Sequence, residues 1–247
     1  MNLNSVFLRY SPALIALSGG VDSSALLAFG KKNGYHVYAA TAVTEFLAEC
    51  DLRHAEDTAE KFGAEWYPLK ISLLDELKHN PENRCYICKL RMMSEMVKLA
   101  EKLGCKAVFD GSHADDLKED RAGAQALREL GVISPFQIAE MGKSDVLRLA
   151  DELGVDKISP SSCLAARISF NDEITIPKLR KVEEAECIMR GYGIHGVLRV
   201  RITDDNAVIE VSGDEIMMAE LHKDELKRLG FNEITVKEYG GVSHGRW

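Results

Sequence analysis

The sequence predicts an α/β protein: a doubly wound parallel sheet in the first part of the chain, followed by a smaller C-terminal α+β domain. Short apolar runs alternate with helix-like stretches, which is typical of β-α-β units. After Pro160 the order changes to a helix, two strands close together, a second helix and a last strand. We therefore expect one domain over residues 1–167 and a second over residues 172–247, joined near Ser169 to Asp172.

Four short apolar runs in the first domain have the composition of buried strands: Ala13 to Leu17, His36 to Thr41, Glu65 to Lys70 and Lys106 to Asp110. Stretches with helical periodicity separate them. In Asp51 to Phe62, for example, Leu52, Ala55 and Ala59 recur on one side of a helix. A helix over Lys143 to Leu153 closes the domain, so we expect a parallel sheet covered by helices.

The second domain is predicted to consist of two helices packed on a short sheet, with elements at Pro177 to Arg190, Val197 to Ile202, Ala207 to Val211, Asp214 to Leu229 and Glu233 to Glu238. Between the first two of these, Gly191 to Gly196 matches the letters of the dinucleotide-binding motif G-x-G-x-x-G. That motif follows a strand and opens a helix, whereas this segment follows a helix and precedes a strand. We interpret it as a loop.

The composition is that of a globular protein, with 247 residues of which 46% are hydrophobic and 28% are charged. No apolar run approaches the roughly 20 residues that span a bilayer, and the N-terminal residues do not resemble a leader, so we expect a cytoplasmic protein with no membrane partner. The net charge is −8 over the chain and −4 over Asn171 to Trp247. Because proteins that bind long nucleic acids usually present a basic face, we expect no such partner.

A glycine turn, Ser18-Gly19-Gly20-Val21-Asp22-Ser23-Ser24, lies between the first predicted strand and a helix-like stretch. Glycines let the backbone approach an anion closely, and the amides and dipole at a helix N-terminus favour a phosphate there. The turn lacks the lysine and the spacing of G-x-x-x-x-G-K-[ST], so it is not the loop of motor ATPases and GTPases. We interpret it as a nucleotide-binding loop; the alternative is a serine-capped helix after a tight turn.

The six cysteines are expected to be reduced, metal-bound or catalytic, because no secretory signal precedes them. Cys85 and Cys88 share one face if a helix begins there, and Cys163, in the connector, is a third candidate ligand. Three thiolates suit an iron–sulfur cluster whose open iron holds a sulfide for transfer, since structural zinc normally takes four protein ligands. A redox dithiol, a zinc site with a histidine, and unlinked packing cysteines are the alternatives. We expect the other three to be buried structural residues: Cys50, Cys105 and Cys187.

The turn from Ser18 to Ser24 resembles the loop of the pyrophosphate-loop (PP-loop) superfamily, whose adenine nucleotide alpha hydrolase-like domains cleave ATP to AMP and pyrophosphate. Further segments are similar, in order, to motifs of the LarE family: Asn83 to Lys89, Asp110 to Asp116, Arg121 to Gly123, Gly131 to Pro135, Ser162 to Arg167, Val197 to Arg201 and Val208 to Val211. The resemblance covers both domains. The ordered set is specific, although each segment alone is weak.

The resemblance implies an ATP-dependent sulfur transferase. LarE-like proteins convert carboxylates of pyridinium-3,5-biscarboxylic acid mononucleotide to thiocarboxylates, on the way to the nickel-pincer nucleotide cofactor; ATP first makes an acyl-adenylate, and sulfur then displaces AMP. In some members the cysteine matching Cys163 gives up its own sulfur and becomes dehydroalanine. In others it joins a Cys-x-x-Cys pair to hold a [4Fe-4S] cluster that carries an extra sulfide. Since this chain has Cys85 and Cys88, the resemblance implies the cluster version, with inorganic sulfide or another sulfur donor, in a homo-oligomer that is a hexamer.

The resemblance also implies roles for individual residues. ATP and Mg²⁺ are expected at the loop from Ser18 to Ser24, where Asp22 orients the loop or the metal, and at Ala40, Thr41, Gly111, Asp115 and Lys143. The small nucleotide substrate is expected at Asp116, Arg121, Glu184 and Glu210. Catalytic roles are expected for Cys163 and for three arginines whose guanidinium groups match phosphate and carboxylate: Arg167, Arg199 and Arg201. Surface charge, helix capping, exposed strand arginines and solvated helix glutamates are the alternatives.

Two other functions are compatible with the same residues. Some tRNA thiolases of the superfamily combine a phosphate loop with Cys-x-x-Cys and a distant cysteine, although the acidic second domain disfavours tRNA. An iron–sulfur sensing or carrier module would use ATP only as a regulator. The chain departs from the family in its tail, residues 238–247, and at His113 and Ala122, where Asn and Pro are common. These departures concern the substrate more than the ATP chemistry.

Overall fold

The computed structural model describes residues 1–118, 122–156, 158 and 162–240. The chain forms two compact units, which are treated one at a time. Unit 1 comprises residues 1–44, 49–71 and 83–158, and unit 2 comprises residues 45–48, 72–82 and 159–247. Each unit therefore draws on separate stretches of the chain, which the sequence alone did not indicate.

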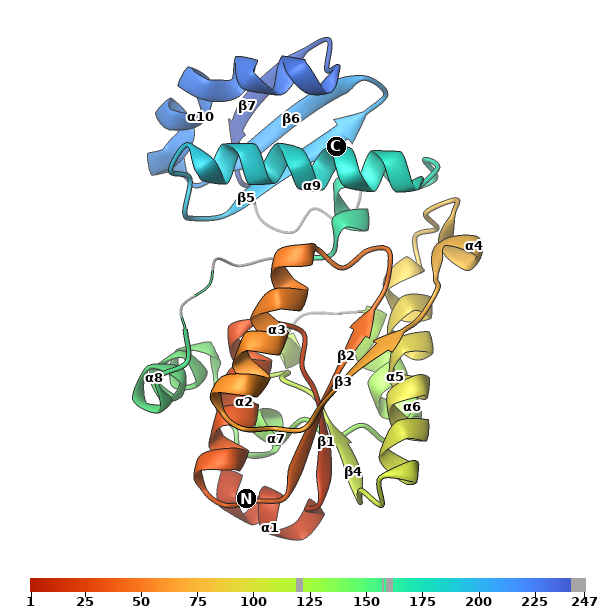
Figure 1. Cartoon of the computed structure of the whole chain (residues 1–247), viewed down its shortest axis with the longest axis vertical. Coiled ribbons are helices and arrows are strands. Elements are labelled where there is room, and N and C mark those ends of the chain that lie inside the picture. Colours follow the sequence, from red (N-terminus) through yellow and green to blue (C-terminus); the bar gives the residue numbers. More distant parts are fainter. Residues whose placement is uncertain (119–121, 157, 159–161, 241–247) are drawn as a thin grey trace. The chain divides into compact units, whose positions relative to one another are not determined.

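Unit 1 is built on a parallel sheet with the strand order β3-β2-β1-β4 (Figure 1). Its strands are Ala13–Ala16 (β1), Val37–Val43 (β2), Trp66–Lys70 (β3) and Ala107–Phe109 (β4). All four predicted strands and the parallel sheet are thus confirmed. The chain runs from β1 to β2 and β3 on one side and returns to β4 on the other, so a topological switch point lies between the carboxyl ends of β1 and β4.

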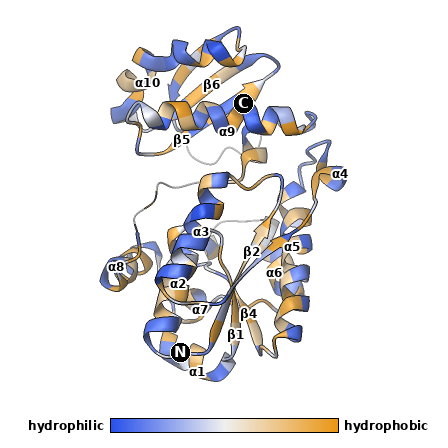
Figure 2. Ribbon diagram, in the orientation of Figure 1, coloured by the Kyte–Doolittle hydropathy of each residue, from blue (hydrophilic) through white to orange (hydrophobic). Residues whose placement is uncertain are grey.

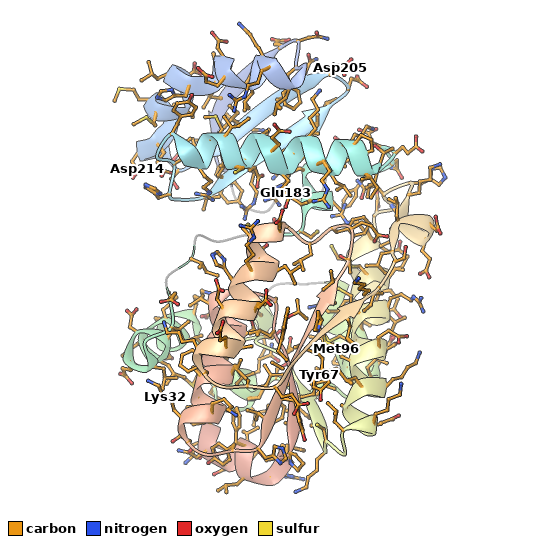
Figure 3. All side chains as sticks on the ribbon, in the orientation of Figure 1. Lys32, Tyr67, Met96, Glu183, Asp205 and Asp214 are labelled. Atoms are coloured by element: carbon orange, nitrogen blue, oxygen red, sulfur yellow. The ribbon has the colours of Figure 1, made fainter. Side chains whose placement is uncertain are left out.

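Helices cover both faces of this sheet because its strands are apolar on both sides. Ile15 belongs to the core on one face of the sheet. Five helices cover that core: α1 (Leu3–Tyr10), α2 (Val21–Lys32), α3 (Glu49–Lys61), α7 (Pro135–Ile138) and α8 (Lys143–Leu153). Leu14 contacts the opposite core, below α5 (Arg84–Lys102) and α6 (Ala122–Glu129). Met96 of α5 and Tyr67 of β3 lie on that second side (Figure 3). The hydropathy colouring follows this arrangement, with apolar strands inside and polar outer faces on the helices (Figure 2).

Unit 2 contains a three-stranded sheet, in which β5 (Leu198–Thr203) pairs antiparallel with β6 (Asn206–Val211), and β6 pairs parallel with β7 (Ile234–Glu238). The helix α9 (Ile176–Gly191) begins at Thr175, whose side chain accepts a hydrogen bond from the Lys178 amide. These elements were predicted, and Gly191 to Gly196 is confirmed as the connection between α9 and β5.

The predicted helix over Asp214 to Leu229 is helical but not one α-helix. It consists of η3 (Gly213–Glu215), α10 (Ile216–His222) and η4 (Lys223–Leu229), with 3₁₀ geometry at both ends. 3₁₀ turns are common at helix ends, although the seven residues of η4 make it longer than most.

Two loops that follow β2 and β3 in the chain complete unit 2: residues 45–48 and 72–82, the latter with α4 (Leu74–Leu77). The Asn80 amide donates to the carbonyls of Ile168 and Ser169 at 2.9 and 2.6 Å. The Leu164 amide donates to the Phe46 carbonyl at 2.9 Å. The turn η2 (Leu164–Arg167), which we expected in the first domain, therefore packs in unit 2. None of the helices in the described ranges has the length and apolar character that crossing a membrane requires.

Candidate functional site

The predicted nucleotide-binding loop lies at the switch point of unit 1, between β1 and the N-terminus of α2. Gly19 has a φ of +82°, and Gly20 is the N-cap of α2. Among the described residues no side chain caps this helix end. The Ser18 amide donates to Ser23 Oγ, and Ser23 Oγ donates to the Gly20 carbonyl, both at 3.1 Å. The loop is therefore closed by its own serines, while the first-turn amides of α2 are directed toward the helix end, where an anion is stabilised.

Ala40 and Thr41, expected near the adenosine, lie beside the start of the loop. The Leu17 amide donates to the Ala40 carbonyl, and Thr41 Oγ1 donates to the Leu17 carbonyl at 2.7 Å. Trp66 Nε1 donates to the same Thr41 oxygen at 2.9 Å. The Thr41 hydroxyl thus supports the loop, and Trp66 is a supporting residue that the sequence did not single out.

Gly111 lies directly against the N-terminus of α2. A Cβ at this position would be 2.9 Å from the Ser23 amide nitrogen, which is closer than Cβ atoms normally come. The preceding residue, Asp110, accepts hydrogen bonds from Ser112 Oγ and Ser134 Oγ, both at 2.5 Å. The segment that follows β4 is therefore fixed beside the loop.

Lys143 and Asp115, both expected at the ATP site, are close to the loop residue Asp22. The Lys143 ammonium is 2.6 Å from Asp22 Oδ1, and the two side chains are partly exposed. The Lys143 amide donates to Asp115 Oδ2 at 2.8 Å. The structure thus brings Asp22, Asp115 and Lys143 together, although they are far apart in the sequence.

Asp116, expected to bind the substrate, is buried in the turn η1 (Ala114–Lys118). Its Oδ2 accepts the His113 amide at 2.9 Å, and its Oδ1 is 3.5 Å from His113 Nε2. These contacts favour a role in holding the turn. Arg121, predicted as a substrate ligand, lies outside the described residues.

In unit 2, Arg167 is almost completely buried and its donors are engaged within the unit. Its Nε and Nη2 donate to the two carboxylate oxygens of Glu186 at 2.7 and 3.0 Å. Its Nη1 donates to the Ser162 and Cys163 carbonyls at 2.9 and 3.1 Å. Glu186 Oε1 also accepts the Val200 amide at 2.9 Å. Arg167 therefore fixes the peptide that carries Cys163, and Glu186 is a further residue that the sequence did not single out.

Arg199 and Arg201 lie on one face of β5, both buried. Burial and the positive charge of Arg167 lower the pKa of Arg199 to about 10. Arg201 Nε donates to Glu210 Oε2 at 2.6 Å, and Arg201 Nη1 donates to the Ala166 carbonyl at 2.8 Å. Since guanidinium groups of like charge are gathered here, an anion would relieve their repulsion.

The two glutamates predicted to bind substrate differ in their surroundings. Glu210 is buried and pairs with Arg201 and with the Lys237 ammonium, 3.0 Å from its Oε1. Glu184 is exposed on α9. The glutamate of α9 that pairs with Arg167 is Glu186, two residues further along the chain.

The cysteines are distributed over both units. Cys85 is exposed and Cys88 half-buried in the first turns of α5, which confirms that they share a helix start; Cys163 is exposed in unit 2. No set of three or more His, Cys, Asp or Glu that would hold a metal occurs among the described residues. The expected burial of Cys50 and Cys187 is wrong, because both are exposed; Cys105, the third cysteine expected to be buried, is partly buried.

Comparison with known proteins agrees with this geometry. Residues 12–85 match the family model described as queuosine biosynthesis protein QueC. A protein of Methanocaldococcus jannaschii is 34% identical over 95% of this chain and 92% of its own length. A protein of Synechocystis is 36% identical over 87% of this chain and 82% of its own length. The pyridinium-3,5-bisthiocarboxylic acid mononucleotide synthase of Lactiplantibacillus plantarum is 31% identical over 94% of this chain and 87% of its own length.

The chain belongs to the LarE family. Because the similarity extends over nearly the whole chain, it includes the LarE segments of unit 2 as well as the glycine loop of unit 1. The parallel sheet with a glycine loop after β1 is the PP-loop α/β fold that the resemblance implied. LarE membership therefore accounts for the glycine loop at the switch point of unit 1.

Proposed function

We propose that this LarE-family protein is an ATP-dependent sulfur transferase that acts on a carboxylate of pyridinium-3,5-biscarboxylic acid mononucleotide in nickel-pincer nucleotide cofactor synthesis. The observation that carries the proposal is the identity of 31% with the L. plantarum synthase over both units. The glycine loop, with its helix end uncapped among the described residues, supports ATP as the activating substrate.

The chemistry has two steps. A carboxylate oxygen of the substrate attacks the α-phosphorus of ATP, and pyrophosphate leaves with the bonding electrons. A sulfur nucleophile then attacks the acyl carbon, and AMP leaves, so a poor leaving group has been exchanged for a good one. The first-turn amides of α2 would bind the phosphates, Asp22 and Lys143 would orient them, and Mg²⁺ would neutralise part of their charge.

The arginines of unit 2 are proposed to bind the substrate's anionic groups. Arg199 is the strongest candidate, because its pKa is depressed by burial and by Arg167, and an anion would stabilise its charged form. Arg201 is oriented by Glu210, and the buried carboxylate keeps its guanidinium plane fixed. Arg167 contributes by holding the Cys163 peptide.

The sulfur is proposed to reach the acyl-adenylate through cysteine chemistry that includes Cys163. The residue types suit an iron–sulfur cluster, because cysteine thiolates are the usual ligands of such clusters. The thiols of Cys85, Cys88 and Cys163 are each at least partly accessible. We propose these residues as the ligands of a [4Fe-4S] cluster, which would supply a bound sulfide when present. Sacrifice of the Cys163 sulfur is the alternative route for the same residue.

An anaerobic incubation with ATP, Mg²⁺, sulfide and the pyridinium biscarboxylate mononucleotide tests the proposal. We expect AMP release and a product heavier by the replacement of oxygen with sulfur, both measured by mass spectrometry. Cys163→Ala should abolish thiolation, whereas Cys187→Ala, an exposed cysteine of the same unit, should not. No carboxylate-dependent AMP release would contradict the function, and AMP release with tRNA instead would favour the thiolase alternative.

Iron binding separates the two sulfur routes. After anaerobic reconstitution, we expect Cys88→Ala to lower the iron content and Cys50→Ala, an exposed cysteine in the same unit, to leave it unchanged. If Cys88→Ala leaves both iron and thiolation unchanged, the cluster is refuted. A dehydroalanine at Cys163 in the recovered protein would then assign the sulfur to that residue.

A further inference from the structure

Asp115 joins two segments of unit 1 that both lie beside the nucleotide-binding loop. Its Oδ2 accepts the Lys143 amide, the first amide of α8, at 2.8 Å. Next to this bond, the Ala114 amide donates to the Met141 carbonyl at 2.8 Å. The turn η1 is therefore bonded to the start of α8 at two adjacent points.

Gly142 makes the close approach of the carboxylate possible. A Cβ on this residue would be 2.8 Å from Asp115 Oδ2, so a larger side chain would displace the carboxylate. The backbone of Gly142 has φ −84° and ψ 177°, which any residue adopts. A side chain at position 142 would therefore have to push the Asp115 carboxylate aside, whereas the backbone conformation does not call for glycine.

The opposite end of Lys143 reaches the loop. Its ammonium is 2.6 Å from Asp22 Oδ1, in the first turn of α2. The backbone of Lys143 is held by Asp115, and its side chain extends to the site at which the phosphates of ATP are proposed to bind. A lysine whose backbone is fixed loses less freedom when its ammonium contacts an anion.

We propose that Asp115 is a positioning residue: it acts on the phosphate site through the backbone of Lys143 and does not itself contact ATP or its metal. This inference rests on the proposed ATP binding and refines the role that the family resemblance implies for Asp115. The ligand that the fixed ammonium recognises is the phosphate chain of a nucleoside triphosphate. Because the interaction needs only an acceptor oxygen, an asparagine amide can replace the carboxylate, whereas a metal ligand or a charge on the site could not be replaced in this way.

The test is calorimetric titration of the full chain with ATP and Mg²⁺, without the carboxylate substrate. We expect Lys143→Met to weaken binding roughly 10- to 100-fold, as for loss of a hydrogen bond between charged groups. Asp115→Ala should weaken it about 5- to 10-fold, as for loss of a helix cap, and Gly142→Ala should do the same. Asp115→Asn should recover most of the affinity that Asp115→Ala loses. In the Lys143→Met background, Asp115→Ala should have no further effect.

Three results would overturn the inference: ATP affinity unchanged in Asp115→Ala, an additive loss in the double variant, or a loss in Asp115→Asn as large as in Asp115→Ala. The last two would assign Asp115 a direct contact with ATP or Mg²⁺. Thermal unfolding of each variant shows whether it is folded. If Asp115→Ala does not fold, Gly142→Ala and Asp115→Asn still decide the test. If the unmodified protein binds no ATP, both the proposed function and this inference fail. If the unmodified protein binds ATP and the variants bind it equally well, only this inference fails.

Discussion

Substitution of Gly19 by alanine tests whether the glycine loop is fixed by its contact with α3. In the present structure Gly19 has a φ of +82°, and an added Cβ would lie 2.1 Å from the Asp51 carbonyl oxygen. The carbonyl carbon and Cα of Asp51 would be 2.9 and 3.1 Å away. All three atoms belong to the backbone in the first turn of α3, so no side chain can rotate to make room.

Two costs add in this variant. A non-glycine residue in the left-handed region costs about 1–2 kcal/mol. Relief of the overlap requires the loop and α3 to separate by about an ångström, and overpacking of this kind costs typically about 1–3 kcal/mol. We therefore expect Gly19→Ala to lower the free energy of unfolding by about 2–5 kcal/mol and to weaken ATP binding, because the loop amides move with Gly19.

Gly34→Ala is the matched control, since Gly34 has a φ of +73° but nothing lies within 4 Å of its added Cβ. Its free energy of unfolding should fall by about 1–2 kcal/mol, the backbone cost alone, and its ATP affinity should be unchanged. Urea unfolding and ATP titration of both variants under anaerobic conditions measure the difference. Equal losses of stability in the two variants, with normal ATP binding by Gly19→Ala, would refute the reasoning.

Three further predictions concern residues elsewhere in the two units. Burial raises the pKa of the Cys105 thiol, so its rate of alkylation should continue to rise with pH beyond the range in which an ordinary thiol has finished titrating; peptide mass spectrometry measures the rate, and a plateau within the ordinary range would contradict the shift. Glu210→Ala leaves the buried Arg201 without its carboxylate and should cost about 3–5 kcal/mol in urea unfolding; a loss below 1 kcal/mol would contradict the pairing. A phosphate-bearing pyridine mononucleotide should raise the unfolding temperature of the unmodified protein, because an anion stabilises the charged form of Arg199, and an equal rise in Arg199→Met would exclude that contact.

The helices and strands of both units were predictable because each depends on a repeat of apolar residues among near neighbours in the chain. β1 to β4 follow from apolar runs, and α9, β5, β6 and β7 follow from periods of 3.6 and 2. The glycine loop was predictable as well, since its residues are consecutive and its chemistry depends on one helix N-terminus.

Burial of the cysteines was predicted less well, and helical phase explains why. On α3 the buried residues are Ala55 and Ala59, and Cys50 lies away from that face. On α9 the buried face includes Ala185 and Met189, and Cys187 lies between them on the other side of the helix. Residue type alone favoured burial, whereas position on the helix determined exposure.

The amino-acid sequence by itself determined three things: the fold class of each unit, the glycine loop, and the strand that carries Arg199 and Arg201. Each of these depends on contacts between near neighbours in the chain. Only the tertiary structure decided that Glu186 holds Arg167 and that Asp115 holds the amide of Lys143. Such pairs are set by how separate elements pack against one another, and a pattern of spacing within a single segment carries no information about that packing.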